Sequence, residues 1–234
     1  MLISFEDEKS FIEGVCLNDI IKNQPTPFYI YSQETITKKY KTLYDTLKSE
    51  IFFSVKANSN QAILTLMCNL GAGADVVSVG ELERAICAGF NPNQIIFEGV
   101  GKSLDDIKYA INKNIRLINV ESIEELETIN SIGKSINKIV NIGIRLNPDI
   151  NSNSLDKIST GKKTDKFGIS LDQLKQIIDL VKLSKYIKLQ GISCHIGSQI
   201  NEISIYEKLF LTMKDLAQII ISNGIDIKYL DLGG

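Results

Sequence analysis

Apolar residues gather in short runs along this chain, and segments with a helical pattern separate most of the runs. The runs are rich in apolar, aromatic and β-branched residues, and we expect them to be apolar on both faces, which is typical of strands that helices cover on both faces. The predicted strands are residues 28–32, 51–56, 74–78, 95–99, 117–121, 140–147, 190–197 and 228–232. The pattern therefore favours a sheet buried between helices over a sheet with one face in water.

The segments between the strands carry signals for the starts and ends of helices. Gly89 and Gly224 stand where a helix commonly ends in a left-handed residue. Strand and helix alternate at a spacing of about 20 residues, which predicts either a (β/α)8 barrel or an open, doubly wound parallel sheet. Three serines are followed three residues later by a side chain that can complete a capping box: Ser103 with Asp106, Ser122 with Glu125, and Ser170 with Gln173.

One polar segment breaks this alternation. Residues 148–167 are too long for an ordinary connection between a strand and a helix. Because long loops at the carboxyl ends of barrel strands usually belong to the active-site face, we expect this segment to lie over the barrel mouth. The sequence LDLGG at 230–234 reads as a strand that runs into a glycine turn, and we interpret the chain as truncated there.

Composition and charge exclude several classes of function. The 234 residues carry a net charge of −2 with no basic stripe, so we expect no nucleic-acid partner. No apolar run is long enough to span a membrane, and the acidic first residues lack the pattern of a secretory leader. Four widely spaced cysteines and a single histidine predict no metal site and indicate a reduced, cytoplasmic protein.

Polar side chains stand at the carboxyl ends of several predicted strands. In a parallel barrel, all of them would reach one rim. A lysine that is desolvated there has a depressed pKa and can condense with a carbonyl group, although a lysine at a barrel mouth can also simply extend into water. The residues are Lys56, Asp75, Glu98, Glu121, Arg145, His195 and Ser198, followed by the glycine pair Gly233 and Gly234.

Each of these signals also has an ordinary structural explanation. A glycine pair after a strand can present backbone N–H groups to a phosphate, but it is equally a common tight turn. A single histidine at a strand end is more often structural than catalytic, and carboxylates on a rim are common. Together, however, the amine, the imidazole and the glycine turn suggest a cofactor with a carbonyl group, a ring and a phosphate, which describes pyridoxal phosphate (PLP).

Five blocks of sequence resemble the fold-type III PLP-dependent decarboxylases. FSVKAN is similar to the lysine box of that family, GAGADVVSVGELERAICAGF to its second conserved block, and YLDLGG to its glycine block. TGKKTDKFGI at 160–169 and GISCHIGSQI at 191–200 resemble the diaminopimelate decarboxylases within the family. The resemblance covers about residues 26–234. It implies a (β/α)8 TIM-type barrel of the alanine racemase kind, with seven of its eight strands present.

The resemblance also implies a reaction and a set of site residues. The reaction would be loss of CO2 from the D-centre of meso-2,6-diaminopimelate, an amino-acid substrate, to give L-lysine. The catalytic candidates are Lys56, which would carry PLP covalently, and His195, which would stack on its ring. The other cofactor-binding candidates are Asp75 beside the lysine, Arg145 near the cofactor, and Ser198, Gly233 and Gly234 at the phosphate.

The chain also departs from the family pattern. It lacks the third glycine of the glycine block, the E-P-G-R block whose glutamate pairs with the pyridine nitrogen, and the C-terminal β-domain. In the family, that domain brings a cysteine acid across a homodimer interface. We expect residues 1–25 to be a lead-in that packs with that domain, and residues 26–234 to be a truncated barrel. The alternatives are an ornithine or arginine decarboxylase of the same fold, a non-catalytic PLP-binding or partner-binding barrel, and an inert fragment.

Overall fold

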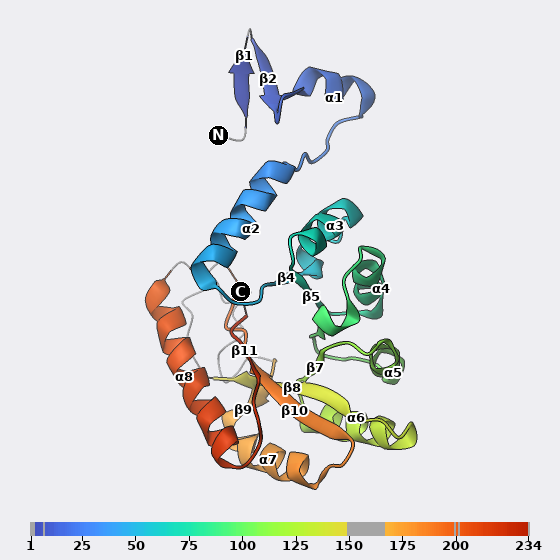
Figure 1. Cartoon of the computed structure of the whole chain (residues 1–234), viewed down its shortest axis with the longest axis vertical. Coiled ribbons are helices and arrows are strands. Elements are labelled where there is room, and N and C mark those ends of the chain that lie inside the picture. Colours follow the sequence, from blue (N-terminus) through green and yellow to red (C-terminus); the bar gives the residue numbers. More distant parts are fainter. Residues whose placement is uncertain (1–2, 7, 149–166, 199, 201, 234) are drawn as a thin grey trace.

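Seven parallel strands form the main sheet of the protein, and the sheet curls into an incomplete barrel (Figure 1). The computed structural model describes residues 3–6, 8–148, 167–198, 200 and 202–233. The sheet is open between its two edge strands, β4 and β11. In spatial order the strands are β4 (Phe52–Ser54), β5 (Gly73–Val76), β6 (Ile95–Phe97), β7 (Leu117–Val120), β8 (Val140–Asn147), β10 (Ile187–Ser193) and β11 (Tyr229–Asp231).

Helices alternate with these strands along the chain and cover the outside of the sheet (Figure 1). A short strand, β9 (Ile169–Ser170), pairs with the end of β8 outside the main path of the sheet. The alternation confirms the predicted barrel architecture with seven strands. The helices are α3 (Gln61–Asn69), α4 (Val79–Cys87), α5 (Leu104–Lys113), α6 (Ile123–Ser135), α7 (Leu174–Leu183) and α8 (Ile203–Ser222).

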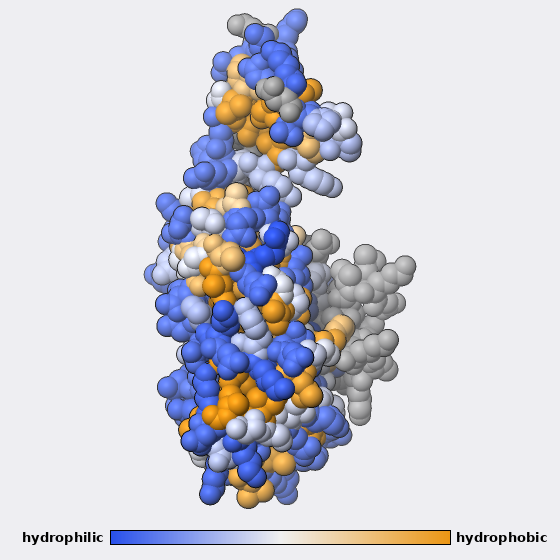
Figure 2. All heavy atoms as spheres, turned by 90° about the vertical axis from the view of Figure 1, so that its right-hand side faces the viewer, coloured by the Kyte–Doolittle hydropathy of each residue, from blue (hydrophilic) through white to orange (hydrophobic). Residues whose placement is uncertain are grey.

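An N-terminal unit precedes the barrel and projects from it (Figure 1). It consists of three short strands and a helix, and the longer helix α2 (Gln33–Leu47) connects it to β4. Apolar side chains gather on its surface (Figure 2), where Phe5 is 71% exposed and Val15 is 51% exposed. Its elements are β1 (Ser4–Glu6), β2 (Lys9–Ile12), β3 (Val15–Cys16) and α1 (Leu17–Asn23). None of the described helices is long and apolar enough to cross a membrane.

The helix signals in the sequence are mostly confirmed. Ser103 and Asp106 form the predicted capping box at the start of α5, and Gly89 and Gly224 are left-handed residues just after α4 and α8. Ser122 caps α6 as expected, but its Glu125 side chain accepts from Glu121 instead of completing the box.

The third capping signal and one strand prediction are wrong. Ser170 makes no capping bond through its side chain, because a short 3-10 turn, Leu171–Gln173, separates it from α7. Residues 28–32 form no strand, because this segment connects α1 to α2 and has no strand beside it to pair with. The strand predicted at 190–197 begins earlier, at Ile187, and ends at Ser193.

At the end of the barrel where the strands begin, one arginine contacts both edge strands. The Arg116 guanidinium lies 5.1 Å from the ring centroid of Phe52 on β4 and 5.3 Å from that of Tyr229 on β11. It also donates two bonds to Glu50, at 2.6 and 3.0 Å. Because β4 and β11 are the two edges of the open sheet, Arg116 bridges the gap between them at this end.

Candidate functional site

A layer of polar side chains crosses the carboxyl ends of the strands. Ser54 on β4 pairs with Asp75 on β5, while Arg145 on β8 pairs with Ser193 on β10, which in turn pairs with Asp231 on β11. Residues paired in neighbouring strands point to the same face of a sheet. The charges of Asp75, Arg145 and Asp231, which come from three different strands, all act on Glu98, so this face is the interior of the barrel. The expectation that the strands are apolar on both faces is therefore wrong at this end.

Lys56 lies just beyond β4, in the 3-10 turn Val55–Ala57, and its side chain is exposed. Burial raises the pKa of Asp75, while a hydrogen bond from Ser54 and the charge of Lys56 lower it. Ser54 Oγ donates to Asp75 Oδ2 at 2.8 Å, whereas Asp75 Oδ1 is buried and has no partner within the described part of the chain. The amine and the carboxyl group are thus within electrostatic reach, but the amine is not desolvated.

Arg145 is a buried cation that two side chains hold in place. Its Nη1 donates to Glu121 Oε1 at 3.1 Å, and its guanidinium lies 5.2 Å from the ring centroid of Phe167. Glu121 Oε2 and the hydroxyl of Ser193 are buried and have no partner among the described residues. Since buried polar atoms are normally hydrogen-bonded, these two atoms are hydrogen-bonding capacity that a polar ligand or water beside Arg145 would satisfy.

Three carboxyl groups influence one another inside the barrel. The pKa of Glu98 is raised to about 8, first because the side chain is buried and then because Asp231 and Asp75 carry like charges. Asn119 donates its side-chain amide to Glu98, and both this bond and Arg145 oppose the rise. Burial also raises the pKa of Asp231. Glu98 is therefore a neutral acid in neutral solution, in a layer that carries more carboxyl groups than cations.

His195 follows β10 and packs against the glycine turn that follows β11. Its pKa is lowered to about 4, mainly by burial and also by the charges of Arg145 and Lys56, so the imidazole is neutral at neutral pH. Gly233 has a φ of +68°, and a Cβ there would lie 2.7 Å from His195 Nδ1 and 2.7 Å from the carbonyl oxygen of Cys194. Only glycine allows this close approach.

The structure describes two of the three predicted phosphate-binding residues, Ser198 and Gly233. Ser198 is exposed in the loop after β10. The N–H of Gly233 donates to Asp231 Oδ1 at 2.8 Å, so a phosphate would have to compete with this bond. Gly234 and nearly all of the polar segment 148–167 lie outside the described residues.

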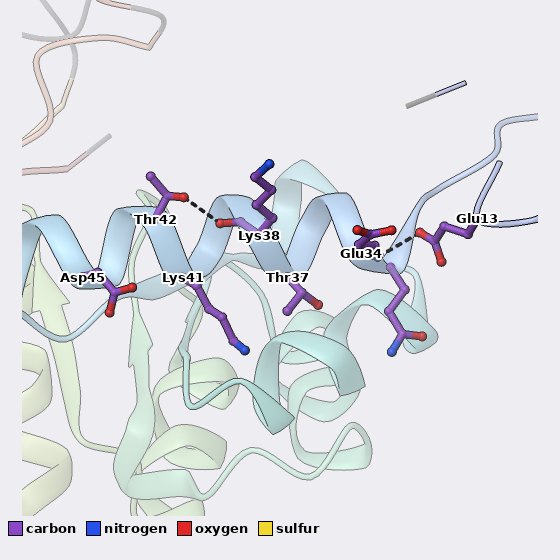
Figure 3. A pocket seen from close by; sticks show the side chains of 8 residues that line it. Glu13, Glu34, Thr37, Lys38, Lys41, Thr42 and Asp45 are labelled. Carbon is purple, nitrogen blue, oxygen red and sulfur yellow. Dashed lines mark hydrogen bonds between the residues drawn. The ribbon is translucent and has the colours of Figure 1, made fainter. Parts of the chain in front are cut away.

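Two other features of the surface and interior do not point to a second site. A hollow runs along α2 and is lined by polar residues of that helix together with Glu13, whose Oε1 accepts from the backbone of Glu34 (Figure 3). None of the seven strands of the main sheet contributes to its lining. Within the described ranges, no three histidine, cysteine or acidic side chains are grouped so that they could hold a metal ion.

Sequence reasoning missed several residues of the interior layer. Asn119 and Ser193 were not singled out, and Asp231 was noted only as part of LDLGG. The period of two along a strand was the available signal, because Asn119 lies two residues before Glu121, and Ser193 two residues before His195.

The fold and this rim define a class of proteins: parallel (β/α) barrels that hold a cofactor at the carboxyl ends of their strands. The family model for the pyridoxal-binding domain of pyridoxal-dependent decarboxylases matches residues 33–234. The chain therefore belongs to the pyridoxal-dependent decarboxylases, and PLP is the cofactor of its family.

Curated relatives and solved structures agree with this assignment. The chain is 37% identical to the diaminopimelate decarboxylase of Pseudomonas aeruginosa, over 99% of the chain and 56% of that protein. It superposes with a TM-score of 0.88 and 36% identity on a diaminopimelate decarboxylase mutant from Helicobacter pylori complexed with L-lysine, covering 92% of this chain and 55% of that one. The Paramecium bursaria Chlorella virus arginine decarboxylase is 25% identical, with a TM-score of 0.79, over 93% of this chain and 57% of that one. The chain thus spans about half the length of the relatives it matches.

The residues at the rim fit PLP. The exposed amine of Lys56 is available to an aldehyde, and the imidazole of His195 is neutral at neutral pH. Buried oxygens of Asp75, Glu121 and Ser193 have no partner among the residues that the structure describes, and they provide unused hydrogen-bonding capacity next to Arg145 and Lys56. Such capacity inside a barrel is what a polar ring with several heteroatoms can satisfy.

Proposed function

We propose that this chain is the cofactor-binding barrel of a diaminopimelate decarboxylase, which removes CO2 from the D-centre of meso-2,6-diaminopimelate to give L-lysine. The observation that carries the proposal is the identity of 37% to a diaminopimelate decarboxylase along 99% of the chain. The interior layer around Lys56, Arg145 and His195 supports it independently, because it supplies the amine, the cation and the neutral ring that a PLP site needs.

When PLP is bound, it delocalises the charge that remains on carbon after a carboxylate leaves. The residues of this chain then have distinct tasks. Lys56 supplies the amine that attaches the cofactor, and its exposed position at the rim leaves it accessible to an incoming amino acid. Arg145, fixed between Glu121 and Phe167, places a positive charge beside the cofactor.

His195 supports the cofactor by packing rather than by proton transfer. A pKa of about 4 leaves the imidazole in its neutral form near neutral pH, so it cannot serve as a cationic acid. Gly233 holds the ring from one side, because its hypothetical Cβ position lies only 2.7 Å from His195 Nδ1. A neutral, fixed aromatic ring is suited to stacking.

The remaining parts of the working enzyme are proposals as well. Residues 1–25 carry exposed apolar side chains, which supports packing against the rest of a longer chain. We propose a homodimer in the cytoplasm as the active form. All four cysteines are free thiols, as a reducing compartment requires.

Another member of the same fold, acting on arginine or ornithine, is the competing function. An arginine decarboxylase matches the fold with a TM-score of 0.79, but its identity is 25% against 36% for the diaminopimelate decarboxylase of Helicobacter pylori. The segments TGKKTDKFGI and GISCHIGSQI, which resemble the diaminopimelate enzymes, favour diaminopimelate as the substrate.

The test is release of CO2 by the full-length protein, loaded with PLP, from meso-diaminopimelate, L-ornithine and L-arginine in parallel. We expect turnover of meso-diaminopimelate alone, and none from the Lys56→Ala variant. Faster release from ornithine or arginine would establish the competing function. PLP binding without release from any of the three would indicate a non-catalytic barrel.

The same assay applied to residues 1–234 alone tests how the site is divided along the chain. The family resemblance assigns the acid that protonates the product to the C-terminal domain, and loss of a general acid typically lowers a rate by about 100- to 10,000-fold. We expect a loss of that order for the 234-residue chain. Equal rates for the two proteins would mean that these residues already hold a complete site.

A further inference from the structure

A buried ion pair lies next to the cofactor rim but outside it. The side chain of Lys102, in the loop between β6 and α5, is 1% exposed, and that of Glu125, on α6, is 13% exposed. Lys102 Nζ donates to Glu125 Oε1 at 2.9 Å, to the carbonyl oxygen of Gly99 at 2.6 Å and to that of Asn119 at 2.7 Å. One cation therefore ties together the loop after β6, the end of β7 and the start of α6.

The pair is connected to Arg145 through a single residue. The second oxygen of Glu125, Oε2, accepts from the backbone N–H of Glu121 at 2.8 Å. The side chain of Glu121 in turn accepts from Arg145 Nη1 at 3.1 Å. Ser122 fixes the other end of this arrangement, since its hydroxyl accepts from the backbone N–H of Glu125 at 3.1 Å.

We propose that Lys102 and Glu125 are positioning residues that hold the end of β7 so that Glu121 aims the Arg145 guanidinium at the cofactor. The inference rests on the proposed function only in taking the ligand beside Arg145 to be PLP. Neither Lys102 nor Glu125 touches the interior layer with its own charged atoms, and both act through the backbone of Asn119 and Glu121.

Stability alone is a weak reason for such a pair. Replacing a buried ion pair by apolar residues of similar size is often neutral or stabilising, because burial of two charges costs much of what their attraction contributes. Apolar residues, however, cannot make the directional hydrogen bonds that fix the backbone. Lys102 and Glu125 fix two backbone groups of β7, the carbonyl of Asn119 and the N–H of Glu121, at hydrogen-bond distances.

The experiment uses the full-length protein in three forms: Glu125→Gln, which keeps the shape and one acceptor, the double variant Lys102→Met/Glu125→Leu, and Lys108→Met as a matched control. Lys108 is an exposed lysine of α5 whose nearest carboxylate, on Asp105, is 3.8 Å away. We measure the dissociation constant of PLP, the visible circular dichroism of bound PLP and the thermal midpoint of the apoprotein. We expect PLP to bind roughly tenfold more weakly in the first two, with an altered dichroism band, and unchanged in the control.

A double-mutant cycle with Arg145 distinguishes a role in positioning Arg145 from a role in overall stability. In an Arg145→Ala background, the tenfold effect of Glu125→Gln should disappear, because the group being positioned is absent. An effect that persists undiminished there would overturn the proposal. So would unchanged PLP affinity and dichroism in both variants, even with a lowered thermal midpoint.

A crystal structure of the Glu125→Gln variant decides the same question without the cofactor. A displaced Arg145 guanidinium supports the positioning role, and an unmoved one contradicts it. If the unaltered full-length protein binds no PLP, the proposed function is wrong, and the position of Arg145 in the variant still decides the role of the pair.

Discussion

Gly233 packs against His195 so closely that a Cβ on the glycine would lie 2.7 Å from Nδ1 of the imidazole. The two residues follow neighbouring strands, β11 and β10, and the backbone N–H of Cys194 donates to the carbonyl oxygen of Asp231 at 3.0 Å between them. The position of the histidine ring therefore depends on a backbone with a φ of +68° and on the absence of a side chain.

The Gly233→Ala variant tests this dependence. We expect it to lower the free energy of unfolding by ~1 to 3 kcal/mol, from the left-handed backbone together with the steric conflict, and to weaken PLP binding. Gly224→Ala is the matched control, because Gly224 also has a positive φ, +84°, but nothing lies within 4 Å of its hypothetical Cβ. Denaturant unfolding and PLP titration of both variants give the comparison. Equal losses of PLP affinity in the two would contradict a steric role at His195.

Covalent attachment of the cofactor can be assigned to one lysine. We expect borohydride reduction of the PLP-loaded full-length protein, followed by peptide mapping, to place the label on Lys56. Its amine is exposed at the rim, whereas the amine of Lys102, the next lysine along the chain, is buried with three oxygen partners. The Lys56→Ala variant serves as the unlabelled control. A label on any other lysine would show that the FSVKAN segment has been misinterpreted.

The sequence predicts the frame of this site better than its interior. The run at 140–147 is β8 to the residue, because β-branched or leucine side chains at every second position, Val140, Ile142, Ile144 and Leu146, give the period of two that a strand requires. The strand predicted at 28–32 from its apolar residues is wrong, because such residues form a strand only where a partner strand lies beside them.

The properties of the site depend on contacts between residues that are far apart in the sequence, and the sequence does not show which residues make these contacts. Lys102 meets Glu125 across 23 positions, and Asn119 meets Glu98 across 21. The left-handed Gly233 turn, by contrast, could be anticipated from the glycine pair. The exposure of Lys56 could not, because it depends on which segments cover the open side of the barrel.

The stacking role of His195 gives a third prediction, on side-chain shape. His195→Ala should weaken PLP binding roughly 2- to 10-fold, which is the usual contribution of an aromatic contact beyond its buried area. His195→Phe should recover part of that affinity, because a neutral imidazole and a phenyl ring both present a flat face. The measurement is PLP titration of the full-length variants. If Phe is no better than Ala, the ring acts through its nitrogens and the stacking role is wrong.

Protonation of Glu98 makes stability depend on pH in a particular direction. The pKa of Glu98 is about 8 in the folded protein, against 4.5 for an unperturbed glutamate, because the side chain is buried near Asp231 and Asp75. Between these two values the folded state holds a proton that the unfolded state has released. The stabilisation is therefore complete below about pH 4.5 and is lost as the pH rises towards 8, by at most ~1.4 kcal/mol per pH unit.

Substituting Glu98→Gln removes this proton from both states while keeping a polar side chain next to Asn119. We expect the unfolding free energy of the unaltered full-length protein to fall by ~1 to 3 kcal/mol more than that of the variant between pH 5 and pH 8. Glu127→Gln, on the exposed face of α6, changes the same charge without burial and should follow the unaltered protein. Urea unfolding at a series of pH values gives the three curves. If the Glu98→Gln curve runs parallel to the other two, Glu98 is ionised in the folded protein, and the interior layer must balance its charge by another route.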